Sequence, residues 1–471
     1  MQYISTRGQA PTIGFCDVLL AGLARDGGLY VPETWPKLIG LTGGASVAST
    51  KNSAAVSYAQ RAAQIMSPFV GDEIDRQVFE RLCVEAYSTF RHPEVAPLVE
   101  IGPNEYLLEL FHGPTLAFKD IALQLVGKLF DFVLAQRNER VMIVGATSGD
   151  TGGAAFDGVA SCRNVDIVML YPNNRVSDVQ RRQMTTLTAP NVHAVAVDGT
   201  FDDCQDLVKA MFNDQKFRDA NRLSAVNSIN WVRVMAQVVY YITAIEKLGR
   251  SAVFSVPTGN FGNVLAGWIA KQMGAQIEGF VVASNTNDIL TRFFESQSMV
   301  ANEVVPTLSP SMDIQVSSNF ERLLFETNDR DGVATGKQLT NFRATGKLDL
   351  VASAYQKWIS GVFAGRRCDD EQTLATMQDV YRQSAMLIDP HTAVGLCAAR
   401  HSAGVDYPKD LPMITLATAH PAKFPDAVRR ATGQTPKLPD HLADLMSRPE
   451  RSVSLPNDLK AVQAFVGSCR N

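Results

Sequence analysis

The sequence contains no long hydrophobic run. No stretch approaches the ~18 apolar residues that a membrane-spanning helix needs. Residues 1–14 mix polar and apolar side chains, whereas a secretory signal has a continuous apolar core. We therefore expect a protein that is neither exported nor bound to a membrane.

Closely spaced cysteines are missing as well. The seven cysteines are scattered along the chain, and no two are spaced as CxxC. This spacing excludes a zinc knuckle and gives no sign of a disulfide framework, and no other grouping of metal-ligating residues is apparent. The sequence therefore predicts a protein without a metal, in the reducing environment of the cytoplasm.

The chain also lacks an excess of charge of either sign. It has 44 Lys and Arg against 48 Asp and Glu, and no long basic run that could bind a phosphodiester backbone. Nucleic acid is therefore not an expected partner. Hydrophobic residues make up 46% and charged residues 20%, which is typical of a soluble globular protein and unlike a disordered chain.

The hydrophobic pattern divides the chain into three regions, in keeping with roughly 150 residues per domain. Residues 1–95 are predicted to form an α-rich N-terminal domain, because 53–66 and 72–87 place apolar residues at helical spacing. Beyond them, short apolar runs alternate with helical stretches, which predicts an α/β fold with open, mostly parallel sheets. We expect one α/β unit over 96–245 and a second over 246–471. The expected strands are 140–144, 165–171, 192–197, 252–256, 277–283 and 413–417.

Lys119 stands just before an apolar helix expected over 121–134, in the stretch HGPTLAFKD. A lysine in such a place is more often a solvated surface residue. The alternative is a partly desolvated amine, because Phe118 and Ile121 flank it. Desolvation lowers the pKa of a lysine towards the range in which it attacks aldehydes, so Lys119 is a candidate catalytic residue.

Two further turns follow expected strands, where ligands of α/β sheets bind. In VMIVGATSGDTGGAA (141–155), hydroxyls and glycines open a helix, which suits a carboxylate or phosphate. The alternative is a tight turn with Ser148 and Asp150 as helix caps. In SVPTGNFGN (255–263), two glycines allow the backbone to close around an anion at a helix N-terminus. Neither a P-loop nor GxGxxG spacing is present, which disfavours a nucleoside triphosphate.

Several strings, in this order, resemble one known family. They are YISTRG (3–8), GGLYVP (27–32), FHGPTLAFKD (111–120), GATSGDTGGAA (145–155), NSINWVRVMAQ (227–237), PTGNFGN (257–263) and ATAHPAKFPDAV (417–428). The combination resembles the tryptophan synthase β-like, fold type II enzymes that use pyridoxal 5'-phosphate (PLP), and the threonine synthases in particular. The resemblance implies two α/β halves that enclose a PLP site.

The resemblance also assigns roles around the cofactor. Lys119 would carry PLP, Phe118 would help to enclose it, and Thr418 would lie near the pyridine nitrogen, although Thr418 alone reads as a strand-end turn residue. The backbone of the phosphate loop would hold the PLP phosphate through Gly259, Asn260, Phe261, Gly262 and Asn263. Many relatives have Asn, which contacts the cofactor 3'-oxygen, where Asp150 stands. An ionised carboxylate cannot donate that hydrogen bond, so we do not expect this contact here.

Threonine synthases convert O-phospho-L-homoserine and water to L-threonine and phosphate, the last step of threonine biosynthesis. The resemblance implies this carbon-oxygen lyase activity. The turn that would receive the substrate α-carboxylate is Thr147, Ser148, Gly149, Asp150 and Thr151. The leaving phosphate needs cations or donors, for which the candidates are Ser228, Asn230 and Arg233, with Arg292, Lys423 and 311–319 as less central choices. Arg233 is either a substrate clamp or an ordinary helix-surface charge.

Two other functions stay open. One is another fold type II elimination or replacement, such as a serine/threonine dehydratase or a cysteine-synthase-like activity, and the N-terminal region and the HGPTLAFKD string argue against it. The other is a homologue that binds PLP or phosphate without turnover, which the presence of Lys119 and of the phosphate loop disfavours. His391 is expected only to stabilise a loop. A small-molecule substrate is expected, and the sequence does not decide between a monomer and a homodimer.

Overall fold

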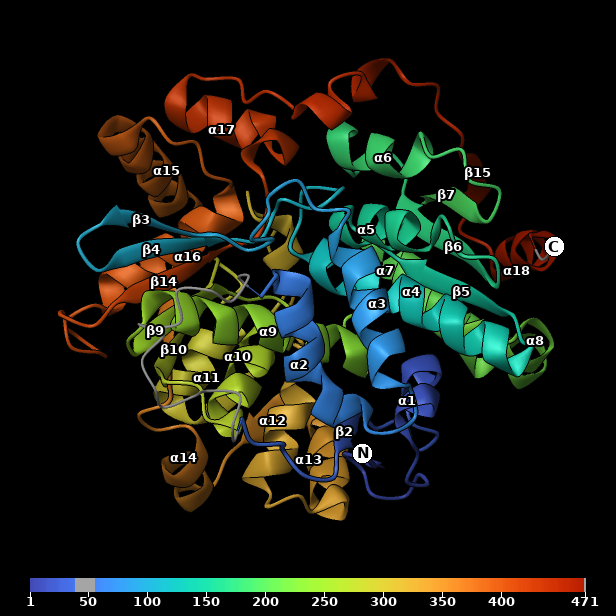
Figure 1. Ribbon diagram of the computed structural model, residues 1–471, viewed down its shortest axis with the longest axis horizontal. Coiled ribbons are helices and arrows are strands. Elements are labelled where there is room, and N and C mark those ends of the chain that lie inside the picture. The colour runs from blue at the N-terminus through green and yellow to red at the C-terminus, as the bar shows by residue number, and fades with distance from the viewer. Residues whose placement is uncertain (39–55, 470–471) are drawn as a thin grey trace.

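Two β-sheets form the centre of the protein (Figure 1). The computed structural model describes residues 1–38 and 56–469. The first sheet is parallel, in the order β15 (Val453–Pro456), β7 (Val192–Asp198), β6 (Val165–Pro172), β5 (Val141–Ala146) and β8 (Leu223–Ser224). The second has the order β13 (Phe363–Arg367), β10 (Ile277–Ser284), β9 (Ala252–Pro257), β14 (Met413–Ala417), β4 (Glu105–Glu109) and β3 (Leu98–Gly102). In this sheet β3 pairs with β4 in the antiparallel direction, and the other neighbouring strands are parallel. The predicted α/β fold with mostly parallel strands is confirmed.

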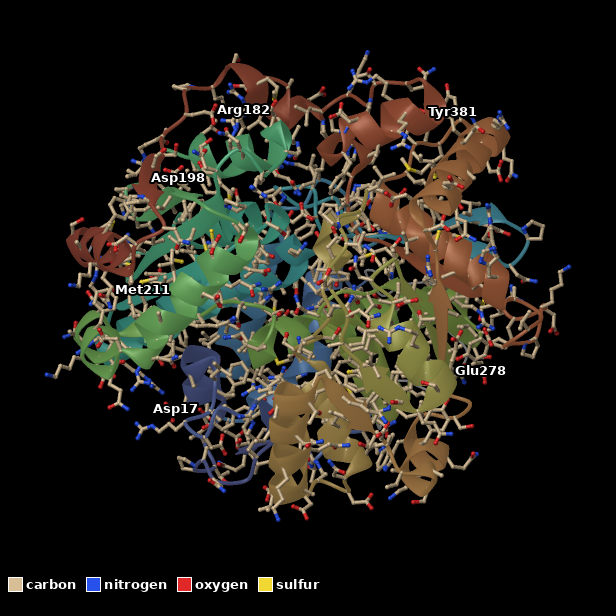
Figure 2. All side chains as sticks on the ribbon, turned by 180° about the vertical axis from the view of Figure 1, so that it is seen from behind. Asp17, Arg182, Asp198, Met211, Glu278 and Tyr381 are labelled. Carbon is tan, nitrogen blue, oxygen red and sulfur yellow. The ribbon has the colours of Figure 1, made fainter. Side chains whose placement is uncertain are left out.

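Helices cover both faces of each sheet, and alternate residues of β5 show how. Met142 and Val144 pack with α7 (Phe201–Asn213) and α18 (Leu459–Ser468), whereas Ile143 joins the core on the opposite face. Seen from behind in Figure 2, α7 and its labelled Met211 lie over the first sheet. The other helices of the two halves are α4 (Lys119–Arg137), α5 (Asp150–Val159), α6 (Asp178–Thr185), α8 (Gln215–Asn221), α9 (Trp231–Leu248), α10 (Gly262–Met273), α11 (Ile289–Ser296), α12 (Phe320–Thr327), α13 (Gly332–Thr345), α14 (Ala352–Trp358), α15 (Asp370–Ser384), α16 (Pro390–Ser402) and α17 (Pro425–Thr432).

The N-terminal region is rich in helix, as predicted. It consists of β1 (Tyr3–Ser5), α1 (Phe15–Ala21), β2 (Tyr30–Pro32), α2 (Tyr58–Val70) and α3 (Arg76–Tyr87). The predicted helix start at residue 53 lies outside the described residues, and α2 begins where Ser57 and Gln60 form a capping box. Because α3 packs against α4 and Thr6 Oγ1 donates to Glu321 of α12 at 2.6 Å, this region contacts both expected α/β units.

The chain crosses between the two sheets at both ends of the α/β region. The β3–β4 hairpin precedes the first sheet in sequence but pairs with β14 of the second sheet. Conversely, β15 follows the second sheet in sequence but pairs with β7 of the first. The division of the chain at residues 95 and 245 remains a prediction.

Smaller elements complete the chain. They are β11 (Ser298–Val300), β12 (Lys347–Asp349), and the 3-10 helices η1 (Pro310–Met312), η2 (Pro421–Lys423), η3 (Asp440–Leu442) and η4 (Leu445–Ser447). All seven cysteines are buried and free. Among the helices of residues 1–38 and 56–469, none is both long and apolar enough to cross a membrane. Within the same residues, no group of acidic, histidine and cysteine side chains is placed to hold a metal ion.

Candidate active site

Lys119 lies between the end of β14 and the start of α5. The backbone N–H of Phe118 donates to the carbonyl of Thr418 (2.9 Å), so the residues before α4 run beside the end of β14. The Lys119 side chain is 11% exposed, and its Nζ donates to Asp150 Oδ2 at 3.1 Å. The interpretation of Lys119 as a solvated surface residue is therefore wrong.

The surroundings of Lys119 favour a neutral amine. Burial lowers the pKa of Lys119, the Asp150 carboxylate opposes this shift, and the positive charges of Lys423 and Arg233 add to it. The net result is a lowered pKa. The Nζ atom also lies 5.0 Å from the centre of the Phe118 ring, so the aromatic ring shields one side of the amine.

A tight loop fixes the position of Lys119. Asp120 accepts hydrogen bonds from Thr115 N (2.8 Å) and Thr115 Oγ1 (2.5 Å), and burial raises the pKa of Asp120 to about 7 despite these bonds. A Cβ on Gly113 would lie 2.5 Å from Asp120 Cβ, so only glycine fits there. Leu116 has a φ of 63°, a conformation that a branched residue rarely adopts. The HGPTLAFKD string thus encodes one rigid loop.

The turn between β5 and α5 is held by Thr147. Its Oγ1 accepts from two backbone N–H groups, one of them that of Gly149, each at 2.9 Å. In the described structure Thr147, and neither Ser148 nor Asp150, accepts from an N–H group in the first turn of α5, so the interpretation of Ser148 and Asp150 as helix caps is wrong. Ser148 and Thr151 are half-buried, and their hydroxyls have no hydrogen-bond partner within the described part of the chain.

The Asp150 carboxylate is shared between two lysines. Oδ2 accepts from Lys119 Nζ (3.1 Å) and from Ser311 Oγ (3.5 Å), whereas Oδ1 accepts from Lys423 Nζ and Gln180 Nε2, both at 2.8 Å. Burial raises the pKa of Asp150, but the two lysines outweigh it and hold that pKa well below its usual value. An ionised Asp150 side chain repels a substrate carboxylate, so the backbone N–H groups and the hydroxyls of this turn suit that ligand, whereas the Asp150 side chain does not.

The phosphate loop ends in an uncapped helix. α10 begins at Gly262, and no side chain of the described residues accepts from its first N–H groups. Phe261 turns the backbone into α10 with a φ of 62°. The hydroxyls of Tyr240 and Tyr241 donate to Asn263 Oδ1 at 2.5 and 2.9 Å. These bonds fix the amide orientation, and the buried Asn263 Nδ2 is left without a partner among the described residues.

Residues 311–319 lie against the phosphate loop. Ser317 Oγ donates to the carbonyl of Gly259 at 2.6 Å. A Cβ on Gly259 would lie 2.5 Å from the carbonyl oxygen of Ser311. Gly259 does not have a positive φ, so the close approach of this segment is what requires glycine.

The substrate-phosphate candidates differ in their surroundings. Ser228 Oγ lies 3.3 Å from Ser318 Oγ, which also donates to the exposed Asn260. Asn230 caps α9 through Val232 N and donates to the Leu19 carbonyl, so both ends of its amide are used. Asn230 therefore holds α9 in place and has no free group for a ligand.

Arg233 is a buried cation without an anionic partner. It is 4% exposed, and its only hydrogen bond from the guanidinium to a described residue goes to the Val226 carbonyl (2.9 Å). Its Nε is buried without a partner in the described structure, and burial lowers the pKa of Arg233 to about 10. Because Arg233 is buried, the interpretation of this residue as an ordinary helix-surface charge is wrong. A buried guanidinium that no described anion pairs is expected where an anionic ligand binds.

Two other residues are engaged in structural contacts. Arg292, on α11, donates through Nε to Asp288 at 2.9 Å and through Nη2 to the Val300 carbonyl at 2.9 Å, so its guanidinium is already engaged. His391 Nδ1 lies 2.9 Å from Asp389, and His391 Nε2 accepts from Ser311 N at 3.3 Å. His391 thus stabilises the segment over the phosphate loop, in agreement with its expected role.

These features fit PLP. The cofactor has an aldehyde, for which Lys119 offers a largely buried amine, and a phosphate, for which α10 offers an uncapped N-terminus and Asn263 an unpartnered donor. The Thr418 hydroxyl makes no hydrogen bond to any residue that the structure describes, so it is available to a ring nitrogen. The sequence indicated Lys119, the backbone of the phosphate loop and Thr418. It gave Lys423 only as a less central candidate for the leaving phosphate and did not place it beside Asp150, although its position between apolar residues in AHPAKF was a signal.

Three family models together match most of the chain. "Threonine synthase N terminus" matches residues 2–87, "Pyridoxal-phosphate dependent enzyme" matches 92–340, and "Threonine synthase, C-terminal" matches 392–466. The boundaries of the first two models fall close to the change in pattern near residue 95. The matches therefore extend the likeness from the individual motifs to whole regions of the chain.

Individual proteins show the same similarity over their full length. The sequence is 52% identical to a threonine synthase of Pseudomonas aeruginosa, with 100% of this chain and 99% of the relative covered. The structure is similar to that of a PLP-bound threonine synthase from Brucella melitensis, with a TM-score of 0.93, 50% identity, and 100% and 99% of the two chains covered. The yeast threonine synthase structure has a TM-score of 0.90 and 38% identity, with coverage of 99% and 98%.

Proposed function

Because the chain belongs to the threonine synthase family of PLP-dependent enzymes, we propose that it converts O-phospho-L-homoserine and water to L-threonine and inorganic phosphate. The choice of substrate rests on the surroundings of Arg233. A buried guanidinium without an anion, close enough to Lys119 to lower its pKa, suits a phosphate that leaves beside the reacting carbons. We place the reaction in the cytoplasm, which fits seven free cysteines.

The cofactor would be held by three parts of the chain. The amine of Lys119 would carry it, Phe118 would cover it, and the ring nitrogen would meet Thr418. The backbone N–H groups of 259–263 and the amide of Asn263 would bind its phosphate. When bound, PLP draws electrons away from the carbon that bears the substrate amine, which acidifies that carbon.

The protein's main task is then to move protons. The reaction needs loss of a Cα proton and a Cβ proton, departure of the γ-phosphate, addition of a proton to Cγ, addition of water at Cβ, and return of a proton to Cα. Once freed by the incoming substrate, the Lys119 amine is the base and then the acid for these carbons. Its lowered pKa favours the neutral form, which a base requires.

Two groups of donors would hold the substrate ends. The backbone N–H groups of the turn 147–151 and the free hydroxyls of Ser148 and Thr151 would bind the α-carboxylate. Arg233 would bind the γ-phosphate, helped by the Ser228 hydroxyl, which already meets Ser318 across the phosphate loop. The attraction between Arg233 and the phosphate strengthens as the leaving phosphate gains negative charge.

The direct test is the identity of the products. Purified protein with PLP is expected to release phosphate and L-threonine from O-phospho-L-homoserine in equal amounts, measured by a phosphate assay and amino-acid analysis. Release of a 2-oxo acid in place of L-threonine would indicate a dehydratase. Absence of both phosphate and L-threonine would support a homologue without turnover. Either result overturns the proposal.

Gly259→Val tests the phosphate loop. The added side chain meets the Ser311 carbonyl, where a Cβ already lies at 2.5 Å, so the loop or the 311–319 segment has to move. Overpacking costs about 1–3 kcal/mol, which corresponds to a roughly 5- to 150-fold loss of PLP affinity at ~1.4 kcal/mol per decade. Affinity is measured from the visible absorption after dialysis. Gly467→Val in α18, where nothing lies within 4 Å of an added Cβ, is the control; equal affinities in the two variants would count against this loop.

A further inference from the structure

Lys423 is a fully buried lysine at the end of η2. Its side chain is 0% exposed, and its Nζ donates to the Thr115 carbonyl and to Asp150 Oδ1, both at 2.8 Å. A buried ammonium has to be balanced by an anion within the protein. The Asp150 carboxylate is the anion that contacts it.

Asp150 serves two lysines through separate oxygens. Oδ1 faces Lys423 and Oδ2 faces Lys119. A buried carboxylate that loses its cation takes up a proton, because burial disfavours the charged form. Lys423 has no contact with solvent. It therefore stays beside Asp150 whether the Lys119 nitrogen is charged or neutral.

Lys119 cannot remain a constant cation. In the proposed function its nitrogen is bonded to the cofactor in the resting enzyme, and it takes up and returns a proton during turnover. Whenever this nitrogen is neutral, Asp150 Oδ2 has lost its cation. Without a second cation, the carboxylate would compete with the amine for the proton.

We infer that Lys423 is a positioning residue whose buried ammonium keeps Asp150 ionised, so that the exchanged proton resides on Lys119. The inference rests on the proposed function, because it takes Lys119 as the base. When a substrate C–H bond breaks, an N–H bond forms on Lys119 and the electron pair stays with the substrate. The return of the proton breaks that N–H bond, and Lys423 and Asp150 keep their charges throughout.

No other cation takes the place of Lys423. Burial lowers the pKa of His420 to about 4, so it is neutral near pH 7. Arg233 makes no hydrogen bond or ion pair with Asp150 in the described structure. The charged and titratable groups that face this centre are Lys119 and Asp120 of α4, Asp150 of α5, Arg233 of α9, His420 before η2, and Lys423.

A titration of the holoenzyme's visible absorption tests the inference. Lys423→Met removes a positive charge, so the nitrogen that joins Lys119 to the cofactor holds its proton more tightly. The midpoint of the absorption change, which reports this proton, moves to higher pH by about 1–3 units. Asp150→Asn removes a negative charge, and its midpoint moves to lower pH. In the double variant the two losses oppose each other, and the midpoint returns towards that of the wild type. A merely structural role does not produce shifts of opposite sign.

The matched control is Lys437→Met, which removes an exposed lysine from the same C-terminal region and keeps the wild-type midpoint. The inference is wrong if Lys423→Met titrates at the wild-type pH, or if both single variants shift in one direction. If Lys423→Met does not fold, Asp150→Asn decides alone, because a midpoint that does not move down overturns the inference. The titration uses no O-phospho-L-homoserine, so it can fail while the product assay succeeds, and the reverse.

Discussion

Lys119→Ala is expected to abolish turnover and leave the fold intact. A general acid–base group alone contributes about 10²- to 10⁴-fold to the rate, and Lys119 in addition would carry the cofactor. The fold survives because the remaining carboxylate is not left alone: Asp150 keeps Lys423 as its ion-pair partner at 2.8 Å. Phosphate release measures the activity, and thermal unfolding measures the stability.

Labelling of the wild-type protein completes this test. Borohydride reduction followed by peptide mapping is expected to place the pyridoxyl group on Lys119. Lys128→Ala removes another lysine of α4, one whose Nζ donates to Ser161 Oγ at 3.3 Å, and is expected to retain full activity. A label on a different lysine would show that the assignment of Lys119 is wrong.

Arg233→Ala is expected to lower kcat/KM for O-phospho-L-homoserine on the order of 10- to 150-fold. A charge-assisted contact to a phosphate is worth roughly 1.5–3 kcal/mol, and each ~1.4 kcal/mol is tenfold in rate. PLP affinity and the visible spectrum are expected to stay unchanged. Binding of L-threonine, which has no phosphate, is also expected to stay unchanged when it is followed by the change in absorption.

Stability separates a ligand-binding role for Arg233 from a structural one. An unpaired buried charge destabilises the phosphate-free protein, so Arg233→Met, which retains the side-chain volume, is expected to unfold at the same or a higher temperature. Arg430→Ala, at an exposed position of α17, is the control for both kinetics and stability. Wild-type kinetics in Arg233→Ala would move the phosphate site elsewhere, most directly to residues 311–319.

The sheets were largely predictable because strands buried on both faces consist mainly of apolar residues. β6 is buried along its whole length, and in the sequence it is apolar apart from Asp166. The strands that the pattern missed have another origin. β15 is mostly exposed and is held by backbone pairing with β7, and backbone hydrogen bonds leave no hydrophobic signature in the sequence.

The site was predictable where it is local. Lys119 and the phosphate loop lie in short segments whose neighbours in sequence are also their neighbours in space. The ion pair of Lys423 with Asp150 joins residues far apart in the chain, which follow strands of different sheets, β14 and β5. The same holds for Ser311, whose carbonyl lies over Gly259. No periodicity encodes such contacts.

Phe261 shows a different limit of sequence reasoning. Two glycines in the phosphate loop suggest that glycine turns the backbone, but the residue with the positive φ is Phe261. A left-handed conformation is unfavourable for an aromatic residue. Phe261 adopts it because its ring is buried and packs against Phe320 and Phe363, so the core imposes the shape of the loop.

The pairing of β15 with β7 has a consequence for synthesis of the protein. Until residues 453–456 have left the ribosome, β7 is the outer strand of the first sheet, with one row of backbone N–H and C=O groups unpaired. An open edge of this kind is a template for strands of other chains. The nascent protein therefore exposes a site for aggregation that closes only when its last strand arrives, and α18 then covers the adjoining face.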